Sequence, residues 1–287
     1  KGFEVYGAGG LGRSSTVGLK LEEFIPATEV LYHVQAMKEI FEAEGDRTNR
    51  NKARIRFIRY RLGDEDFIKK YREQVRTVKT EKDLEIDEIV EYSKISNNDL
   101  MRIENNLIVK QKNKGFYAVY IHPENGNLAN EDLSSLITFI GNLNYEVSFR
   151  VTNTQGIFVR DLNAKDASEL IKIIEGFTST FDMDNSVACT GASTCKLGLC
   201  LSQKLLLGIK GRFEDVDLKI KSQLPRIFIS GCPNSCGQHQ IGKIGLSGKA
   251  KGTEKGLIPM YTIHFGGKSQ ANNAKLGENY GDIPAKK

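Results

Sequence analysis

Residues 224–237 read Leu-Pro-Arg-Ile-Phe-Ile-Ser-Gly-Cys-Pro-Asn-Ser-Cys-Gly and join a short apolar run to two cysteines. Residues 225–230 are rich in apolar and β-branched side chains, which predicts a short buried strand. That strand runs directly into Gly231 and Cys232, and Cys236 follows in a C-x3-C pair. The stretch therefore predicts a strand followed by a loop that contains two thiols.

All five cysteines of the 287-residue chain lie between Cys189 and Cys236. Five cysteines are too few for a disulfide scaffold in a chain of this length, and core thiols would be scattered along it. A second pair, Cys189 and Cys195, has C-x5-C spacing and precedes the first pair by enough chain for a helix and a strand. The clustering favours a metal or redox site.

The spacing favours an iron–sulfur cluster over zinc. Structural zinc sites commonly use C-x2-C pairs, whereas a cluster needs four thiolates around a larger body and accepts wider, loop-borne spacings. Gly191, Gly231 and Gly237 would let the backbone close around such a cluster. Zinc, with His239 completing the site, stays the second interpretation, and a set of reduced thiols stays the third.

The fifth cysteine, Cys200, is expected to be a buried thiol rather than a ligand. It lies five residues beyond Cys195, on a predicted helix that would not turn both toward one cluster. The helix is predicted from four leucines: Leu197, Leu201, Leu205 and Leu206.

The N-terminal glycines Gly7, Gly9 and Gly12 match the spacing G-x-G-x-x-G. In a dinucleotide site a helix opens at these glycines, because its N-terminus holds the pyrophosphate. Residues 13–18 lack helical periodicity, which argues against a nicotinamide oxidoreductase. A loop that lets the backbone approach a ligand or a strand is the preferred interpretation.

Two helices and a basic segment are predicted next. The first helix would begin at the N-cap Thr28 and end at Gly45, with one buried stripe formed by Val30, Val34, Met37 and Phe41. Residues 47–61 hold seven basic residues and no acid, and the apolar helical face predicted for them consists of Ala53, Phe57 and Tyr60. This segment is either a solvated surface or a site for a polyanion. A short helix is expected through Phe67, Tyr71 and Val75.

Residues 77–110 are expected to connect two units, with a helix around residues 84–92. The following segment predicts the order β-α-β-β-α of a small ferredoxin-like unit, with strands at 115–121, 147–151 and 157–159 and helices from Asn130 and Asp166. Thr152 and Asn153, in the turn before the third strand, either satisfy backbone groups or face a ligand.

The two ends of the chain resemble each other. Residues 4–7 lead through glycines to Ile-Pro-Ala at 25–27, and residues 261–264 lead through glycines to Ile-Pro-Ala at 283–285. We therefore expect an internal repeat, in which the chain starts part-way through one copy and stops part-way through the next. With Lys1 in place of Met at the start, a fragment of a longer polypeptide is expected.

Composition sets broad limits. A length of 287 residues suggests about two domains, and 39% hydrophobic and 27% charged residues are typical of a globular protein. The formal charge of +5 does not distinguish between classes of function. We see no apolar run that approaches a membrane helix and no signal peptide, so a cytoplasmic location and no membrane partner are expected.

The cysteine pattern, with residues 231–237 at its centre, closely resembles the siroheme and [4Fe-4S] motif of the nitrite and sulfite reductase haemoprotein family. Residues 9–12, 49–54 and 150–155 resemble other recurring segments of that family, in the same order. The resemblance implies an α+β fold, with a ferredoxin-like βαββα half-domain flanked by parts of two duplicated α+β siroheme/Fe-S lobes. Four segments are expected: the end of the first lobe at 1–76, a linker at 77–110, the half-domain at 111–177 and a second lobe, truncated at its C-terminus, at 178–287.

The resemblance also implies the cofactor ligands. The [4Fe-4S] cluster would be held by Cys189, Cys195, Cys232 and Cys236. Cys236 would also ligate the siroheme iron, with Asn234 beside it. The remaining siroheme contacts, which would meet its carboxylates and ring, are expected at Gly9, Gly10, Arg13, Arg50, Lys52 and Arg54.

The implied reaction is the six-electron reduction of nitrite to ammonia or of sulfite to sulfide, with electrons from reduced ferredoxin or a separate donor subunit. The family's substrate-binding Arg and Lys would precede residue 1, and residues 224–229 carry apolar side chains where the first lobe has lysines. This chain is therefore expected to bind a cluster and to hold siroheme poorly or not at all. The alternatives are a zinc-stabilised module that binds nucleic acid through residues 47–61, and a cluster-only electron-transfer protein. No nucleic-acid partner is expected on the preferred interpretation.

Overall fold

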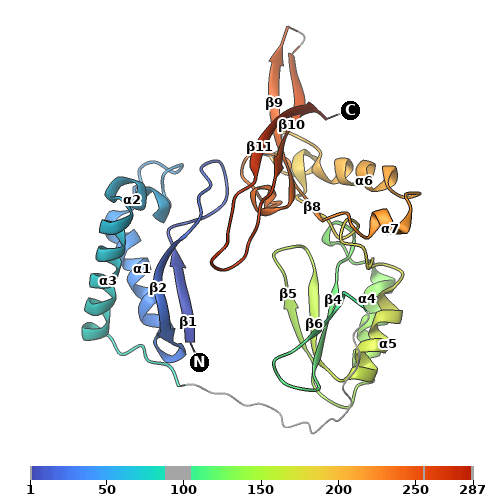
Figure 1. The fold of residues 1–287 in the computed structure, drawn as a ribbon, viewed down its shortest axis with the longest axis horizontal. Coiled ribbons are helices and arrows are strands. Elements are labelled where there is room, and N and C mark those ends of the chain that lie inside the picture. The colour runs from blue at the N-terminus through green and yellow to red at the C-terminus, as the bar shows by residue number, and fades with distance from the viewer. Residues whose placement is uncertain (1, 88–104, 255, 286–287) are drawn as a thin grey trace. The chain divides into compact units, whose positions relative to one another are not determined.

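The computed structural model describes residues 2–87, 105–254 and 256–285, and the chain divides into two compact units, Lys1–Glu91 and Tyr92–Lys287 (Figure 1). Each unit has a hydrophobic core of its own. None of the helices in these described ranges is long and apolar enough to cross a membrane.

The first unit packs three helices against an antiparallel hairpin. Its elements are β1 (Gly2–Gly7), β2 (Leu19–Pro26), the 3-10 turn η1 (Ala27–Glu29), α1 (Val30–Glu44), α2 (Ile55–Leu62) and α3 (Asp64–Glu81). The core is built from Leu21 of β2, Ala36 and Ile40 of α1, and Phe67 and Tyr71 of α3. Burying aromatic and aliphatic side chains from every layer holds the hairpin to the helices.

The predicted buried stripe of α1 is right for Met37 and Phe41, which pack against the core, and wrong for Val34. Tyr32, Ala36 and Ile40 are buried at i, i+4 and i+8, while Val34 is 60% exposed. The face that turns inward is set by α3, whose Tyr71 hydroxyl lies 2.5 Å from Nδ1 of the buried His33. A small alanine, an amphipathic tyrosine and a histidine carry little periodic signal. The helix does end before Gly45 as predicted, but Thr28 lies within η1 rather than at the N-cap.

The basic segment 47–61 is only partly helical, because α2 begins at Ile55. Its predicted apolar face is also wrong: Ile58 and Arg56 are buried and Tyr60 is 52% exposed. The helix α3 is longer than expected and crosses the boundary placed at residue 76. Residues 84–87 are not helical, and the rest of the helix predicted over 84–92 lies outside the described residues.

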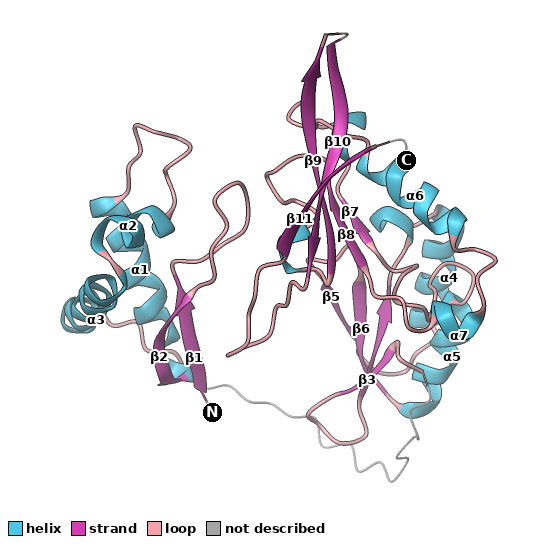
Figure 2. Cartoon of the chain, turned by 45° about the horizontal axis from the view of Figure 1, so that its top comes forward, coloured by secondary structure: helices cyan, strands magenta, loops and turns pink. Residues whose placement is uncertain are grey.

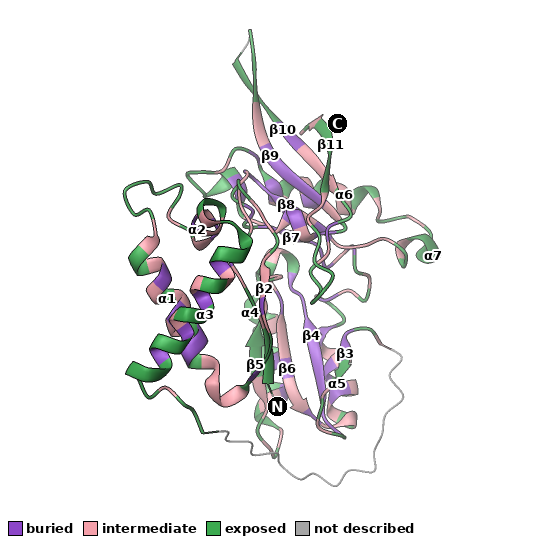
Figure 3. Cartoon of the chain, turned by 60° about the vertical axis from the view of Figure 1, so that its left-hand side comes forward, coloured by how far each residue is buried: buried purple, intermediate pink, exposed green. Residues whose placement is uncertain are grey.

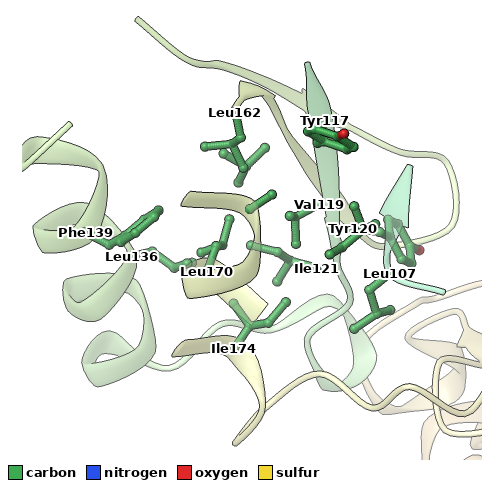
Figure 4. Close-up of a cluster of buried hydrophobic side chains, with 13 residues drawn as sticks. Leu107, Tyr117, Val119, Tyr120, Ile121, Leu136, Phe139, Leu162, Leu170 and Ile174 are labelled. Carbon is green, nitrogen blue, oxygen red and sulfur yellow. The ribbon is translucent and has the colours of Figure 1, made fainter. Parts of the chain in front are cut away.

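The second unit begins with a four-stranded antiparallel sheet of order β3-β4-β6-β5. Its elements are β3 (Ile108–Lys110), β4 (Tyr117–Ile121), the 3-10 turn η2 (Glu124–Gly126), α4 (Asn130–Gly141), β5 (Ser148–Val151), β6 (Ile157–Leu162) and α5 (Ala164–Ile174). Both helices cover one face of the sheet (Figure 2). Side chains from β4, α4 and α5 interdigitate in the core between them (Figure 4). The ferredoxin-like βαββα order is confirmed, with β3 added from the stretch expected to be a linker.

Burial differs sharply across this sheet. The central strand β4 is buried along its whole length, whereas β5 is an edge strand and mostly exposed (Figure 3). The helix α5 is capped by Asn163, whose side chain accepts from the amide of Asp166 at 2.8 Å. The predicted start at Asp166 was three residues late.

The rest of the second unit is a five-stranded sheet of order β11-β10-β9-β8-β7. Its strands are β7 (Val187–Ala188), β8 (Ile227–Ser230), β9 (Ile244–Thr253), β10 (Gly256–Phe265) and β11 (Glu278–Pro284). Its helices are η3 (Gly191–Ser193), α6 (Ser202–Arg212), α7 (Leu218–Lys221) and η4 (His239–Ile241). The leucine-rich helix begins only at Ser202, so Leu197 and Leu201 precede it, and Leu197 is 68% exposed.

The structure confirms the internal repeat. In the hairpin β1–β2, Phe3 pairs with Ile25 next to Pro26, and in β10–β11 Tyr261 pairs with Ile283 next to Pro284. Each connecting loop is closed by one isolated antiparallel bridge, Gly10 with Thr16 in the first copy and Lys268 with Lys275 in the second.

Candidate metal centre

Two of the cysteine-bearing loops start at the same edge of the five-stranded sheet. Strands β7 and β8 are parallel, with Ala188 opposite Ile229, so their carboxyl ends lie side by side. Cys189 follows β7, and Gly231 and Cys232 follow β8. The Gly231 amide donates to Sγ of Cys189 at 3.1 Å. The topology therefore brings together thiols that lie more than forty residues apart in the sequence.

Charge interactions link Cys236 to the other three predicted ligands. The pKa of the Cys236 thiol is raised, first by burial and then by the charges of Cys189, Cys232 and Cys195. Like charges raise a thiol pKa, so these three thiols lie within electrostatic range of Cys236. A positive metal or cluster placed among them would offset that repulsion and favour the thiolates.

The spacing of these groups is not that of a single-ion site. Among the described residues, no three His, Cys, Asp or Glu side chains converge closely enough to hold one metal ion. Zinc needs its four ligands at about 2–2.3 Å from one centre. Four soft thiolates on separate loops are the donor set that an iron–sulfur cluster takes.

Cys200 is a buried thiol, as predicted. Its Sγ donates to the carbonyl of Met260 at 3.3 Å, and burial raises its pKa. It borders an apolar cavity of about 940 Å³ between α6 and β10, with Tyr261 beside it. The residue lies in the turn before α6, however, and not on the helix.

Glycines allow the close approach of the loops. Gly191 has a φ of +60°, and a Cβ there would lie 2.4 Å from the Cys200 carbonyl oxygen. A Cβ on Gly237, next to Cys236, would lie 2.0 Å from the Ile229 carbonyl oxygen. Any side chain at either position would push the cysteine loops apart.

The buried side chains of Ser230 and His239 support the C-x3-C loop. The Ser230 hydroxyl accepts from the Gly237 amide at 3.0 Å and lies 2.9 Å from Nδ1 of His239. Burial lowers the pKa of His239 to about 3, so the ring is neutral. His239, considered above as a zinc ligand, instead braces the loop that carries Cys236.

The polar turn of residues 150–156 is tied to the cysteine loops. Thr152 bonds only within its turn, to the backbone of Gly156 at 3.0 Å. Gln155 pairs with the backbone of Ala188 like a neighbouring strand, donating from Nε2 at 2.9 Å and accepting at Oε1 at 3.0 Å. Gln238, two residues beyond Cys236, donates to the Asn153 carbonyl. Sequence reasoning named this turn but not the bracing role of Gln155.

In the first unit, Arg56 holds the glycine loop together. Its guanidinium donates to the carbonyls of Gly10 at 2.9 Å, Leu11 at 2.9 Å and Ser14 at 2.6 Å. No helix follows Gly12, since the next element is the strand β2, so the dinucleotide interpretation fails. Sequence reasoning missed Arg56, which only its position in the basic run could have suggested.

The predicted siroheme contacts of the first unit lie on exposed surface. Gly9, Gly10 and Arg13 are in the glycine loop, and Arg50, Lys52 and Arg54 are in the loop before α2. Arg54 donates to its neighbour's carbonyl, that of Ala53, at 2.6 Å. In the second unit, Asn234 is exposed between Cys232 and Cys236. Their roles toward siroheme stay predictions.

Thiols gathered at the end of parallel strands, with a ferredoxin-like unit in the same chain, define a class of iron–sulfur redox protein. Two sequence models of one family match: "Nitrite and sulphite reductase 4Fe-4S domain" over residues 1–79 and "Nitrite/Sulfite reductase ferredoxin-like half domain" over residues 109–176. The chain belongs to the nitrite and sulfite reductase haemoprotein family, as its cysteine pattern predicted. The cofactors of that family are a [4Fe-4S] cluster and siroheme.

Relatives match over most of the chain. The NADPH sulfite reductase hemoprotein beta-component of Staphylococcus carnosus is 26% identical over 98% of this chain and 49% of its own. The ferredoxin sulfite reductase 1 of Mycolicibacterium paratuberculosis is 26% identical over 93% of this chain and 47% of its own. The NirA protein of Mycobacterium tuberculosis has the same fold, with a TM-score of 0.76, 23% identity and coverage of 99% of this chain and 52% of its own. The chain thus spans about half the length of these proteins.

Proposed function

We propose that this chain forms part of an enzyme that reduces sulfite to sulfide, or nitrite to ammonia, with six electrons. The cluster would be held by Cys189, Cys195, Cys232 and Cys236. On this proposal residues 1–76 belong to a first lobe, 111–177 to the ferredoxin-like half-domain and 178–287 to a second lobe.

The observation that supports the proposal best is the placement of Cys189 and Cys232 directly after the paired strands β7 and β8, with Cys236 within range of their charges. Cys200 is buried and bonds the Met260 carbonyl, so it is not proposed as a ligand. Four thiolates are the ligand set that a [4Fe-4S] cluster takes. The zinc interpretation lacks a three-ligand group in the described parts of the chain.

The chain's own groups would support the cofactors in distinct ways. Cys236 is exposed at the end of its loop, and on this proposal it would hold both the cluster and siroheme. Siroheme, when bound, supplies an iron face on which an oxyanion is reduced. The exposed Arg50, Lys52 and Arg54 would neutralise its peripheral carboxylates. Two other arginines of that run, Arg56 and Arg59, already bond backbone carbonyls of the glycine loop and its neighbourhood, which weakens the nucleic-acid alternative.

The electron donor is proposed to be a protein. The relatives named above are a hemoprotein component of an NADPH enzyme and a ferredoxin-dependent enzyme. One name gives ferredoxin, and the other gives NADPH for an enzyme of which the relative is the beta-component. We propose delivery by ferredoxin or a separate donor subunit here, with sulfite or nitrite as the acceptor.

The test uses the chain purified from a host that makes siroheme, alongside Cys236→Ser. Because the chain alone is expected to hold siroheme poorly, siroheme is supplied in excess, and the chlorin absorbance that the wild-type chain then retains is expected to be lost in Cys236→Ser. Sulfide or ammonium formed from sulfite or nitrite with a one-electron dye then identifies the substrate. A wild-type chain that carries a cluster but retains no chlorin even with siroheme in excess, and reduces neither anion, would replace this proposal with the cluster-only electron carrier.

A further inference from the structure

One buried hydroxyl touches the candidate cluster site without belonging to a predicted ligand. Ser202 is the first residue of α6 and is fully buried. Its Oγ donates to the Cys189 carbonyl at 2.6 Å and lies 3.4 Å from the Cys189 Sγ. The hydroxyl is therefore within hydrogen-bonding distance of both polar groups of one ligand.

The surroundings fix this hydroxyl in place. A Cβ built on Gly191 would lie 2.5 Å from the Ser202 Oγ, and one built on Gly231 would lie 3.3 Å from it. The Gly231 carbonyl also accepts from the amides of Leu199 and Cys200, at 2.8 and 3.0 Å, in the turn just before α6. Three chain segments thus close around Oγ, and its distance to the sulfur is held by the fold.

The chemistry at Cys189 follows from the cluster assignment. A cysteine that ligates iron is a thiolate and can only accept hydrogen bonds. The Gly231 amide donates to this sulfur, and the Ser202 hydroxyl, whose one proton is directed at the Cys189 carbonyl in the structure, can turn that proton to a thiolate 3.4 Å away. The positive end of α6 lies beside both donors. Donors to cluster sulfurs stabilise the additional negative charge of the reduced cluster.

We propose that Ser202 is a positioning residue that raises the reduction potential of the cluster through Cys189. The inference rests on the proposed function, since it needs a cluster at these cysteines. The step concerned is the transfer of one electron from a one-electron donor to the oxidised cluster, [4Fe-4S]²⁺ to [4Fe-4S]⁺. No bond is made or broken and no proton is transferred.

The experiment is a potentiometric titration with dithionite of the full chain, reconstituted anaerobically with iron and sulfide and followed by electron paramagnetic resonance. Ser202→Ala is expected to shift the midpoint potential to a more negative value. The matched control is Ser186→Ala, another buried serine of this unit, whose hydroxyl bonds Met183 and Ile227 backbone groups and no cysteine. The control should leave the potential unchanged.

The outcomes separate the two proposals. A wild-type chain that incorporates no cluster overturns the proposed function. A Ser202→Ala chain with a full cluster and the wild-type potential overturns the role of Ser202. If the Ser202→Ala chain does not hold the cluster, the midpoint potentials of Ser202→Thr and Ser202→Val are compared instead. Threonine and valine have nearly equal volume, and only threonine keeps the hydroxyl. A more negative midpoint potential in Ser202→Val than in Ser202→Thr supports the proposed role of the hydroxyl, and equal potentials contradict it.

Discussion

Cys236 is an exposed residue whose thiol lies within range of the charges of three other cysteines. Its pKa is raised by burial and by three neighbouring thiols, while Cys200 lies in the core with a backbone carbonyl as its partner. The division into four thiols and one was predictable from spacing, because the two pairs flank Cys200. The donors around the sulfurs were not, since Ser202 and the Gly231 amide become neighbours of Cys189 only after β7 and β8 pair.

Cys232→Ser should abolish most binding of iron and sulfide, whereas Cys200→Ser should retain both. The two residues are a matched pair, because both thiols are buried, at 8% and 2% exposure. Serine is a poor ligand for cluster iron, so only a true ligand position is sensitive to the change. Iron and acid-labile sulfide per chain measure the effect. Equal loss in both variants would contradict the assignment.

His122 should make the chain less stable in mild acid. Its pKa is lowered from 6.5 to about 4, chiefly by burial and then by Arg226, and Nε2 lies 3.0 Å from the Thr154 carbonyl oxygen. The folded pKa is below the unfolded one, so the stabilisation is complete above pH 6.5 and is lost as the pH falls toward 4. From pH 7.5 to 5 this residue should cost about 2 kcal/mol of unfolding free energy.

The measurement is urea unfolding of the cofactor-free chain at both pH values, for wild type and His122→Gln. The loss of stability between the two pH values should be smaller in the variant by about that amount. The same loss in both proteins would show that His122 is not the titrating group.

At the scale of elements, the sequence predicted most strands and helices and misjudged which faces turn inward. Short apolar segments located β4, β6 and β8, and alternation located β5. In contrast, α1 buries Tyr32, Ala36 and Ile40 because α3 packs there. Arg56 is buried because three carbonyls of a loop more than forty residues away accept from it. Such long-range pairings leave no periodic pattern in the sequence.

Strand β7 has only two residues and should depend on the Gln155 side chain. That amide satisfies both backbone groups of the fully buried Ala188. Gln155→Ala would leave them unpaired and should lower the unfolding free energy by about 2 kcal/mol. Gln223→Ala, at an exposed glutamine bonded only to Ser222, is the control and should have little effect. Urea unfolding measures both, and similar effects of the two changes would contradict the bracing role.

Two glycines of the second lobe should respond in opposite ways to alanine. Gly237→Ala places a Cβ 2.0 Å from the Ile229 carbonyl oxygen, so it should destabilise the chain and reduce cluster binding. Gly211→Ala, inside α6 with no atom within 4 Å of the added Cβ, should stabilise it by up to about 1 kcal/mol. Thermal unfolding and iron content test the pair. A Gly237→Ala chain that binds iron as well as wild type would show that the loop tolerates a side chain.

At the scale of the whole molecule, the hairpins β1–β2 and β10–β11 are similar in structure and lie near opposite ends of the chain. The Ile-Pro-Ala segments were the visible signal, and the structure adds the matching registers and the isolated bridge in each loop. The family matches fall on residues 1–79 and 109–176, outside the cysteines, so family membership and the cysteine geometry are independent lines of argument. They agree on the same chemistry.

The most direct test of that chemistry is the content of iron, acid-labile sulfide and zinc in the anaerobically reconstituted chain, measured with its ultraviolet–visible spectrum on one sample. The account predicts about four iron and four sulfide per chain, the broad absorbance of a cluster, and no stoichiometric zinc. A colourless chain with one zinc and no sulfide would contradict it.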